Sequence, residues 1–137
     1  MKIAVIDAQG AGLGQTIIKE LIKEIPDNID ITALGINSLA ASNMLKAGAT
    51  HSISGEKPIC AFFKANKIDC LIGPIGIICS GGINGEVTPS ISKAIFNMNC
   101  AKYILPLQMH GIYIPGTRNL KIKDMIEEIV LDIKKNI

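Results

Sequence analysis

Short apolar runs alternate with longer amphipathic segments along the chain. Runs of strand length bounded by turn residues predict β-strands, and apolar residues at helical spacing predict helices. The predicted strands are residues 2–6, 29–34, 50–53, 68–72 and 101–105, with a short sixth strand at an edge over 111–114. The predicted helices are residues 17–25, 38–46, 55–66, 89–98 and 120–133. Strand and helix therefore alternate.

Two helix starts carry capping signals. Ser38 has a hydroxyl that can cap the helix it precedes, and Gly48 closes that helix. Thr88 and Pro89 combine a capping hydroxyl with a proline at the first helical position. Both signals support the predicted boundaries.

This alternation predicts the fold class. Strands separated by helices form a mostly parallel sheet, and right-handed crossovers place helices on both of its faces. Near-continuous apolar strands such as 68–72 are typical of parallel strands covered on both sides. We predict a doubly wound, Rossmann-like α/β domain over residues 1–137, with a five- to six-stranded sheet in the order 3-2-1-4-5.

Two glycine-rich loops follow the first and fourth predicted strands, at residues 8–14 and 73–85. In doubly wound sheets a ligand binds beyond the carboxyl ends of the strands, where the winding reverses. That point lies between strands one and four, so the two loops are expected to meet there.

The first loop has the composition of a phosphate-binding turn. Gly10, Gly12 and Gly14 remove side chains that would keep an anion from the backbone amides at the start of a helix. The spacing is one residue short of the dinucleotide fingerprint, whose third glycine would fall on Gln15. The alternative is that these glycines serve only close packing of helix on strand.

A nucleotide or dinucleotide is the ligand that this arrangement favours, with NAD or NADP as candidates. The acidic residue that holds the ribose in NAD-binding domains is missing after the second strand, where Asn37 stands instead. Asp7 could accept a ligand hydroxyl or hold a magnesium ion, or it could be held by amides of the turn, and the last interpretation is favoured. The predicted ligand-binding residues are Asp7, Gln9, Gly10, Ala11, Gly12, Leu13, Gly14, Asn37, Gly73, Pro74, Ile75 and Gly76.

Composition narrows the class of partner. The net charge is only +2, Arg118 is the single arginine and there is no tryptophan, which argues against nucleic acid. No apolar run approaches the roughly 20 residues that span a bilayer, and the start of the chain lacks a signal-peptide pattern, so we expect a cytoplasmic protein. A mean hydropathy of +0.36 leaves apolar area to cover, and predicts a homodimer.

Other reactive residues give weaker signals. The four cysteines form no Cys-x-x-Cys pair and are interpreted as free thiols, and no metal site is predicted. His51 and His110 have no partner that would make them catalytic. Glu86 is a candidate general base, but a solvated glutamate is the ordinary expectation, as a surface position is for Arg118.

The chain resembles a bacterial family known only as a domain of unknown function, the one numbered thirty-eight forty-two. The segments that carry the resemblance cover nearly the whole chain and are residues 5–7 with the glycine turn, 33–37, 44–49, 72–76 and 85–89. Ala8 and Ala11 depart from a turn that is richer in glycine in that family. The resemblance implies a small Rossmann-like domain and no particular reaction.

Three functions remain open at this point. The first is nucleotide binding at the glycine turn. The second is a small enzyme acting on a phosphorylated metabolite, with Asp7, Glu86 or Thr88 assisting. The third is a non-catalytic interaction module that uses the apolar loop 74–83, with Ile77 in the interface. Fold class alone does not separate them.

Overall fold

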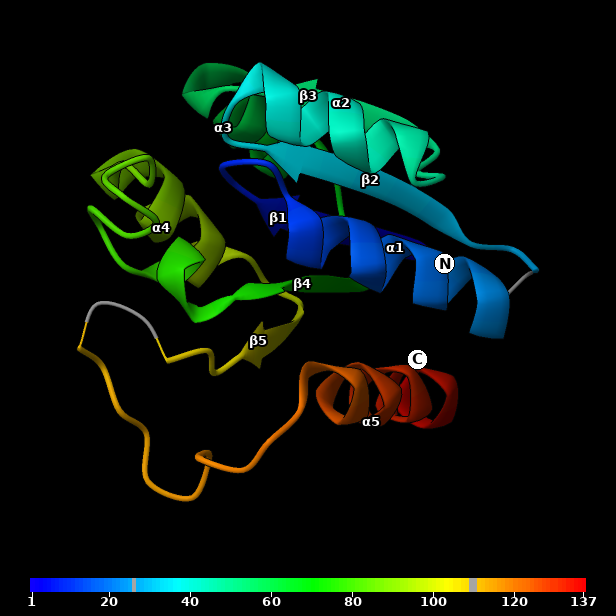
Figure 1. Ribbon diagram of the computed structural model, residues 1–137. Coiled ribbons are helices and arrows are strands. Elements are labelled where there is room, and N and C mark those ends of the chain that lie inside the picture. The colour runs from blue at the N-terminus through cyan, green and yellow to red at the C-terminus, as the bar shows by residue number, and fades with distance from the viewer. Residues whose placement is uncertain (26, 109–110) are drawn as a thin grey trace.

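The sheet is five-stranded and entirely parallel (Figure 1). The computed structural model describes residues 1–25, 27–108 and 111–137. The strands are β1 (Lys2–Asp7), β2 (Asp30–Gly35), β3 (His51–Ser54), β4 (Cys70–Pro74) and β5 (Ala101–Leu105). Their order is β3-β2-β1-β4-β5. The predicted doubly wound α/β fold and strand order are confirmed.

Helices cover both faces of this sheet. They are α1 (Gly12–Glu24), α2 (Ser38–Lys46), α3 (Glu56–Ala65), α4 (Pro89–Asn97) and α5 (Ile122–Asn136), with a short 3-10 helix, η1 (Ile75–Ile78), after β4. Buried residues of α1, α2 and α5 form one apolar cluster, and those of α3, η1 and α4 form another. The sheet therefore separates two apolar layers.

Strand β1 shows why the central strands are apolar at every position. Ile3 and Val5 pack into the cluster under α1, whereas Ala4 and Ile6 pack into the cluster under α4. Alternate side chains of a strand point to opposite faces, so a strand covered on both sides has no solvent-facing position. This burial fixes the carboxyl end of β1 beneath the first glycine turn.

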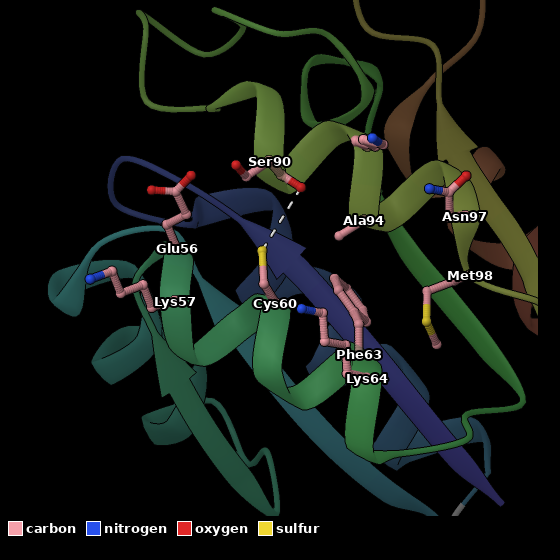
Figure 2. Close-up of a pocket in the computed structure, with 10 residues that line it drawn as sticks. Glu56, Lys57, Cys60, Phe63, Lys64, Ser90, Ala94, Asn97 and Met98 are labelled. Carbon is pink, nitrogen blue, oxygen red and sulfur yellow. Dashed lines mark hydrogen bonds between the residues drawn. The ribbon is translucent and has the colours of Figure 1, made fainter.

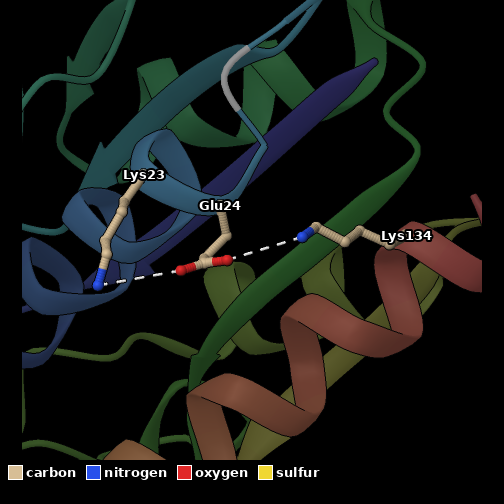
Figure 3. Close-up of polar contacts among 3 residues, drawn as sticks. All are labelled: Lys23, Glu24 and Lys134. Carbon is tan, nitrogen blue, oxygen red and sulfur yellow. Dashed lines mark ion pairs between the residues drawn. The ribbon is translucent and has the colours of Figure 1, made fainter.

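Helix α5 closes the outer side of the layer that contains α1. Its buried stripe is Met125, Ile126, Ile129, Val130 and Ile133. Near its end, Lys134 Nζ lies 3.7 Å from Glu24 Oε2 on α1, and Lys23 Nζ lies 3.9 Å from Glu24 Oε1 (Figure 3). Exposed ion pairs contribute little, so the apolar stripe holds α5 in place.

Two local predictions are wrong. The cap of α2 is Asn37 rather than Ser38, because the Asn37 side chain accepts the amide of Ala40 at 2.8 Å. Residues 111–114 form no strand, and no ladder pairs them with β5. The stretch begins at Gly111, whose φ is 72°, and ends before Pro115. Figure 1 shows residues 111–121, which precede α5, as a loop that extends from the body. His110 lies outside the described residues.

Candidate functional site

The turn between β1 and α1 is tight and left-handed at two residues that are not glycine. Ala11 donates its amide to Ala8 O at 2.9 Å, and α1 begins at the next residue. Gln9 and Ala11 have φ of 50° and 56°, a conformation that costs free energy for residues with a Cβ. Such strain persists only where surrounding contacts hold it.

Three amides of this turn have no acceptor. Within residues 1–25, 27–108 and 111–137, the N–H groups of Gly10, Gly12 and Leu13 donate to no protein atom. A Cβ built at Gly10 or Gly12 would meet nothing within 4 Å. We call Gly10, Gly12 and Leu13 the amide cradle. Free amides at a helix N-terminus, unscreened by side chains, form the type of site that binds anions.

The amide cradle faces a small cavity of about 170 Å³. The turn itself forms most of its wall, and Pro74, Ile83 and Leu107 complete it. The cavity therefore joins the carboxyl ends of β1, β4 and β5. This is the point where the winding of the sheet reverses, as the sequence predicted.

The third glycine of the turn has a different role. A Cβ at Gly14 would lie 2.6 Å from Met44 Sδ and 3.2 Å from Asp7 Cβ. Gly14 is therefore required for packing α1 against α2 and β1. The packing interpretation of the glycine triplet therefore applies to Gly14, whereas Gly10 and Gly12 face open space.

The Asp7 carboxyl stabilises the turn by accepting two of its backbone amides. Its Oδ1 accepts the Ala8 amide at 2.8 Å and its Oδ2 accepts the Gly14 amide at 2.9 Å. Burial raises the pKa of this carboxyl, the two amides partly offset that rise, and Glu86 adds to it. Asp7 is thus a carboxylate held by amides of the turn, the interpretation favoured from the sequence.

Glu86 reaches the same turn from the loop before α4. Its Oε2 accepts the Gln9 amide at 3.1 Å, and its Oε1 accepts Asn37 Nδ2 at 2.6 Å. Asn37 Nδ2 also donates to Gln9 O at 3.1 Å. Glu86 and Asn37 therefore clamp Gln9 in its left-handed conformation. Both hydrogens of the Asn37 amide are used in this clamp, and Asn37 does not line the cavity.

This role of Glu86 differs from the general base or solvated glutamate expected from the sequence. No acidic residue follows β2 in the sequence, yet the fold places Glu86 beside Asn37 although 49 residues separate them. A glutamate in a glycine-rich loop that faces another glycine-rich loop was the available signal. Only the tertiary fold pairs it with Gln9 and Asn37.

Most of the second loop packs against its own core. A Cβ at Gly73 would lie 2.7 Å from Ile6 O, and one at Gly76 would lie 2.7 Å from Ile83 Cγ1. Pro74 alone of residues 73–76 lines the cavity. Ile77 is fully buried. The prediction that Ile77 lies in an interface is therefore wrong, because its side chain points into the core, whereas the neighbouring Ile78 is 42% exposed.

The remaining reactive residues lie away from the cradle. His51 Nε2 is 3.5 Å from Asp30 Oδ1 at the β3 edge, and the Arg118 guanidinium lies 5.2 Å from the centre of the Tyr113 ring. All four cysteines are free. The described residues contain no cluster of three or more metal-ligating side chains, and none of their helices is long and apolar enough to cross a membrane.

Comparisons with known proteins place the chain in a family and a fold. The model of the family described as Domain of unknown function (DUF3842) matches residues 2–137, in agreement with the resemblance seen in the sequence. No curated protein matches the chain.

A solved structure shares the fold at low identity. It is the dodecameric FMN-dependent UbiX-like decarboxylase from Escherichia coli O157:H7, with a TM-score of 0.55 and 11% identity. The match covers 100% of this chain and 96% of that one. It supports the Rossmann-like α/β fold, and it gives no support to NAD or NADP in particular.

Proposed function

The chain belongs to the DUF3842 family, and we propose that it binds a phosphate-bearing nucleotide, with the phosphate on the amide cradle. The observation that carries this proposal is the set of free amides at Gly10, Gly12 and Leu13. Gly10 and Gly12 are exposed, so their amides are accessible to a ligand, and a phosphate oxygen would accept hydrogen bonds from them. The missing side chains at Gly10 and Gly12 leave room for that group.

The size of the cavity favours a mononucleotide. At about 170 Å³ it is smaller than the roughly 300–1,000 Å³ typical of sites that enclose a whole ligand. It suits a phosphate group, with the sugar and base lying outside along the carboxyl edge of the sheet. The structural neighbour is described as FMN-dependent, which makes FMN the first compound to test.

The strained turn also supports a binding role. Gln9 and Ala11 are held in the left-handed region by the Glu86 and Asn37 clamp and by the bond from Ala11 to Ala8. Packing of α1 explains Gly14, but it does not explain why Gly10 and Gly12 leave their amides open. Backbone strain of this kind is typical of sites preorganised for a ligand.

Titration with FMN and with riboflavin tests the phosphate contact directly, because the two compounds differ by the phosphate alone. Quenching of flavin fluorescence gives each Kd. We expect FMN to bind at least about tenfold more tightly than riboflavin. Equal affinities, or no binding of FMN, NAD, NADP or ATP in a thermal-shift series, would contradict the proposal. A ligand at a hundredfold excess over Kd adds about 2.7 kcal/mol of stability, which is readily detected.

Gly12→Val tests the cradle itself. The valine side chain would project from the cradle without meeting protein atoms, so the fold should persist while FMN binding is abolished. Thr16→Val is the matched control, since it places the same side chain one turn later at an exposed position of α1. If Gly12→Val binds FMN as tightly as Thr16→Val does, the phosphate does not lie at the cradle.

A second proposal concerns self-association. Ile112 and Tyr113 are 39% and 49% exposed on the loop between β5 and α5. Apolar side chains on an extended loop are often covered by a partner. The neighbour of shared fold is dodecameric, which is consistent with a homo-oligomer here, most simply the dimer predicted from the sequence.

A further inference from the structure

A groove runs between α3 and α4, on the sheet face opposite α1, α2 and α5 (Figure 2). Its volume is about 730 Å³, several times that of the cavity at the amide cradle. Ser90 and Met98 line it from positions eight residues apart, which corresponds to about 12 Å along the helix direction. The groove has the volume of a small-molecule site.

The floor of the groove is apolar. Phe63 is almost fully buried, and Ala94 and Met98 are half-buried against the same core cluster. The Cys60 thiol donates to Ser90 O across the groove at 3.8 Å, as Figure 2 shows. An aromatic ring, a methyl group and a thioether together form a surface that suits an apolar chain.

The rim of the groove is positively charged. Lys57, Lys64 and Lys93 line it, and none has an ion-pair partner among the described residues. Glu56 is the single acidic residue in the lining, and it accepts the Thr88 hydroxyl at 2.8 Å. Three unpaired cations around an apolar floor complement a ligand with an apolar body and a negative group.

We propose that the α3–α4 groove binds a small amphipathic carboxylate of the medium-chain fatty-acid type. The alkyl chain lies along Phe63, Ala94 and Met98, and the carboxylate pairs with a rim lysine. Lysine stems pack against apolar surface while their ammonium groups stay in water, so the rim contacts both parts of the ligand. This site is independent of the nucleotide proposal, because it shares no residue with the amide cradle.

Sodium decanoate, kept below its micellar concentration, is the probe. Amide ¹H–¹⁵N spectra of the full chain should show saturable shifts confined to α3 and α4, and Met98 methyl signals should move with them. Decanol, which has the same chain without the charge, should bind at least about tenfold more weakly. Chemical-shift changes at the rim lysines with none at Met98 would overturn the proposal. Equal affinities for decanoate and decanol would also overturn it.

Charge reversal supplies the matched variants. A triple variant that reverses the charge of the rim should raise the Kd for decanoate at least about tenfold. Its substitutions are Lys57→Glu, Lys64→Glu and Lys93→Glu. The control is a triple variant with the same change in net charge at exposed positions away from the groove, and it should leave the Kd unchanged. Its substitutions are Lys19→Glu, Lys121→Glu and Lys135→Glu. If both triple variants bind decanoate equally weakly, the effect is due to overall charge, and the proposed site is wrong. Ala94→Leu, which fills the floor, should weaken decanoate and decanol alike; unchanged binding of both would also overturn it.

Discussion

Asp7 is the residue on which the geometry of the first turn most directly depends. It is 7% exposed, and each of its carboxyl oxygens accepts one amide, from Ala8 and from Gly14. Burial outweighs these amides and raises its pKa above the ordinary value of 3.8. Ionised Asp7 therefore costs the folded state stability, although its hydrogen bonds order the turn.

The pH dependence of unfolding tests this account of Asp7. Below pH 3.8 the carboxyl is neutral in both states; above it the unfolded chain ionises first, so this group's contribution to stability falls until the pH passes the raised folded pKa. Urea unfolding between about pH 3 and 7 should show this fall in the wild type and not in Asp7→Asn. Asp27→Asn, at an exposed position, should keep the wild-type slope. Parallel profiles for wild type and Asp7→Asn would contradict the account.

At the scale of elements, a polar contact joins α5 to the sheet beside its apolar stripe. Tyr103 on β5 donates its hydroxyl to Asp132 Oδ2 on α5 at 2.5 Å. Burial and Asp132 both raise the pKa of Tyr103. The phenol therefore stays protonated above its usual range, and the stability due to this contact is lost only as the pH rises above about 10.

Tyr103→Phe removes this contact while keeping the ring. We expect a loss of about 1 kcal/mol in the free energy of unfolding at neutral pH, because one hydrogen bond to a charged acceptor is lost at a half-exposed site. Chemical denaturation measures the change. Tyr113→Phe, at the other tyrosine, alters an exposed ring and should leave stability unchanged. A similar loss in both variants would show that the Asp132 contact contributes nothing specific.

At the scale of the whole molecule, the loop between β5 and α5 exposes apolar side chains that a second copy of the chain would cover. Figure 1 shows its residues 111–121 extending beyond the helices before α5 begins. The guanidinium of Arg118 stacks over Tyr113, so the loop has some internal order. We propose that its exposed apolar residues, Ile112 and Tyr113, contact a second copy of the chain.

The double variant Ile112→Asp/Tyr113→Asp tests the proposal that this loop contributes to a homo-oligomer interface. Placing two carboxylates in a buried interface should raise the dissociation constant at least about tenfold, visible by sedimentation velocity or native mass spectrometry. Phe96→Asp is the control, because Phe96 is 79% exposed on α4 and lies outside the loop. Dissociation by Phe96→Asp and not by the loop variant would place the interface on α4 instead.

The sequence by itself determined the architecture of this protein. Apolar strands of length five or so, separated by amphipathic helices, allow few arrangements besides a doubly wound parallel sheet, because crossovers are right-handed and both sheet faces must be covered. The same pattern placed the glycine turn after β1, beside the loop that follows β4. These features depend on periodicity and chain order, which a sequence contains in full.

Only the tertiary structure decided what each residue of the site does. It assigned Gly14, Gly73 and Gly76 to packing and left Gly10 and Gly12 open, a difference that depends on which atoms lie within a few ångströms. It also brought Glu86 to Gln9, 77 residues away. Local pattern cannot specify such distances, because they follow from how whole helices pack on the sheet.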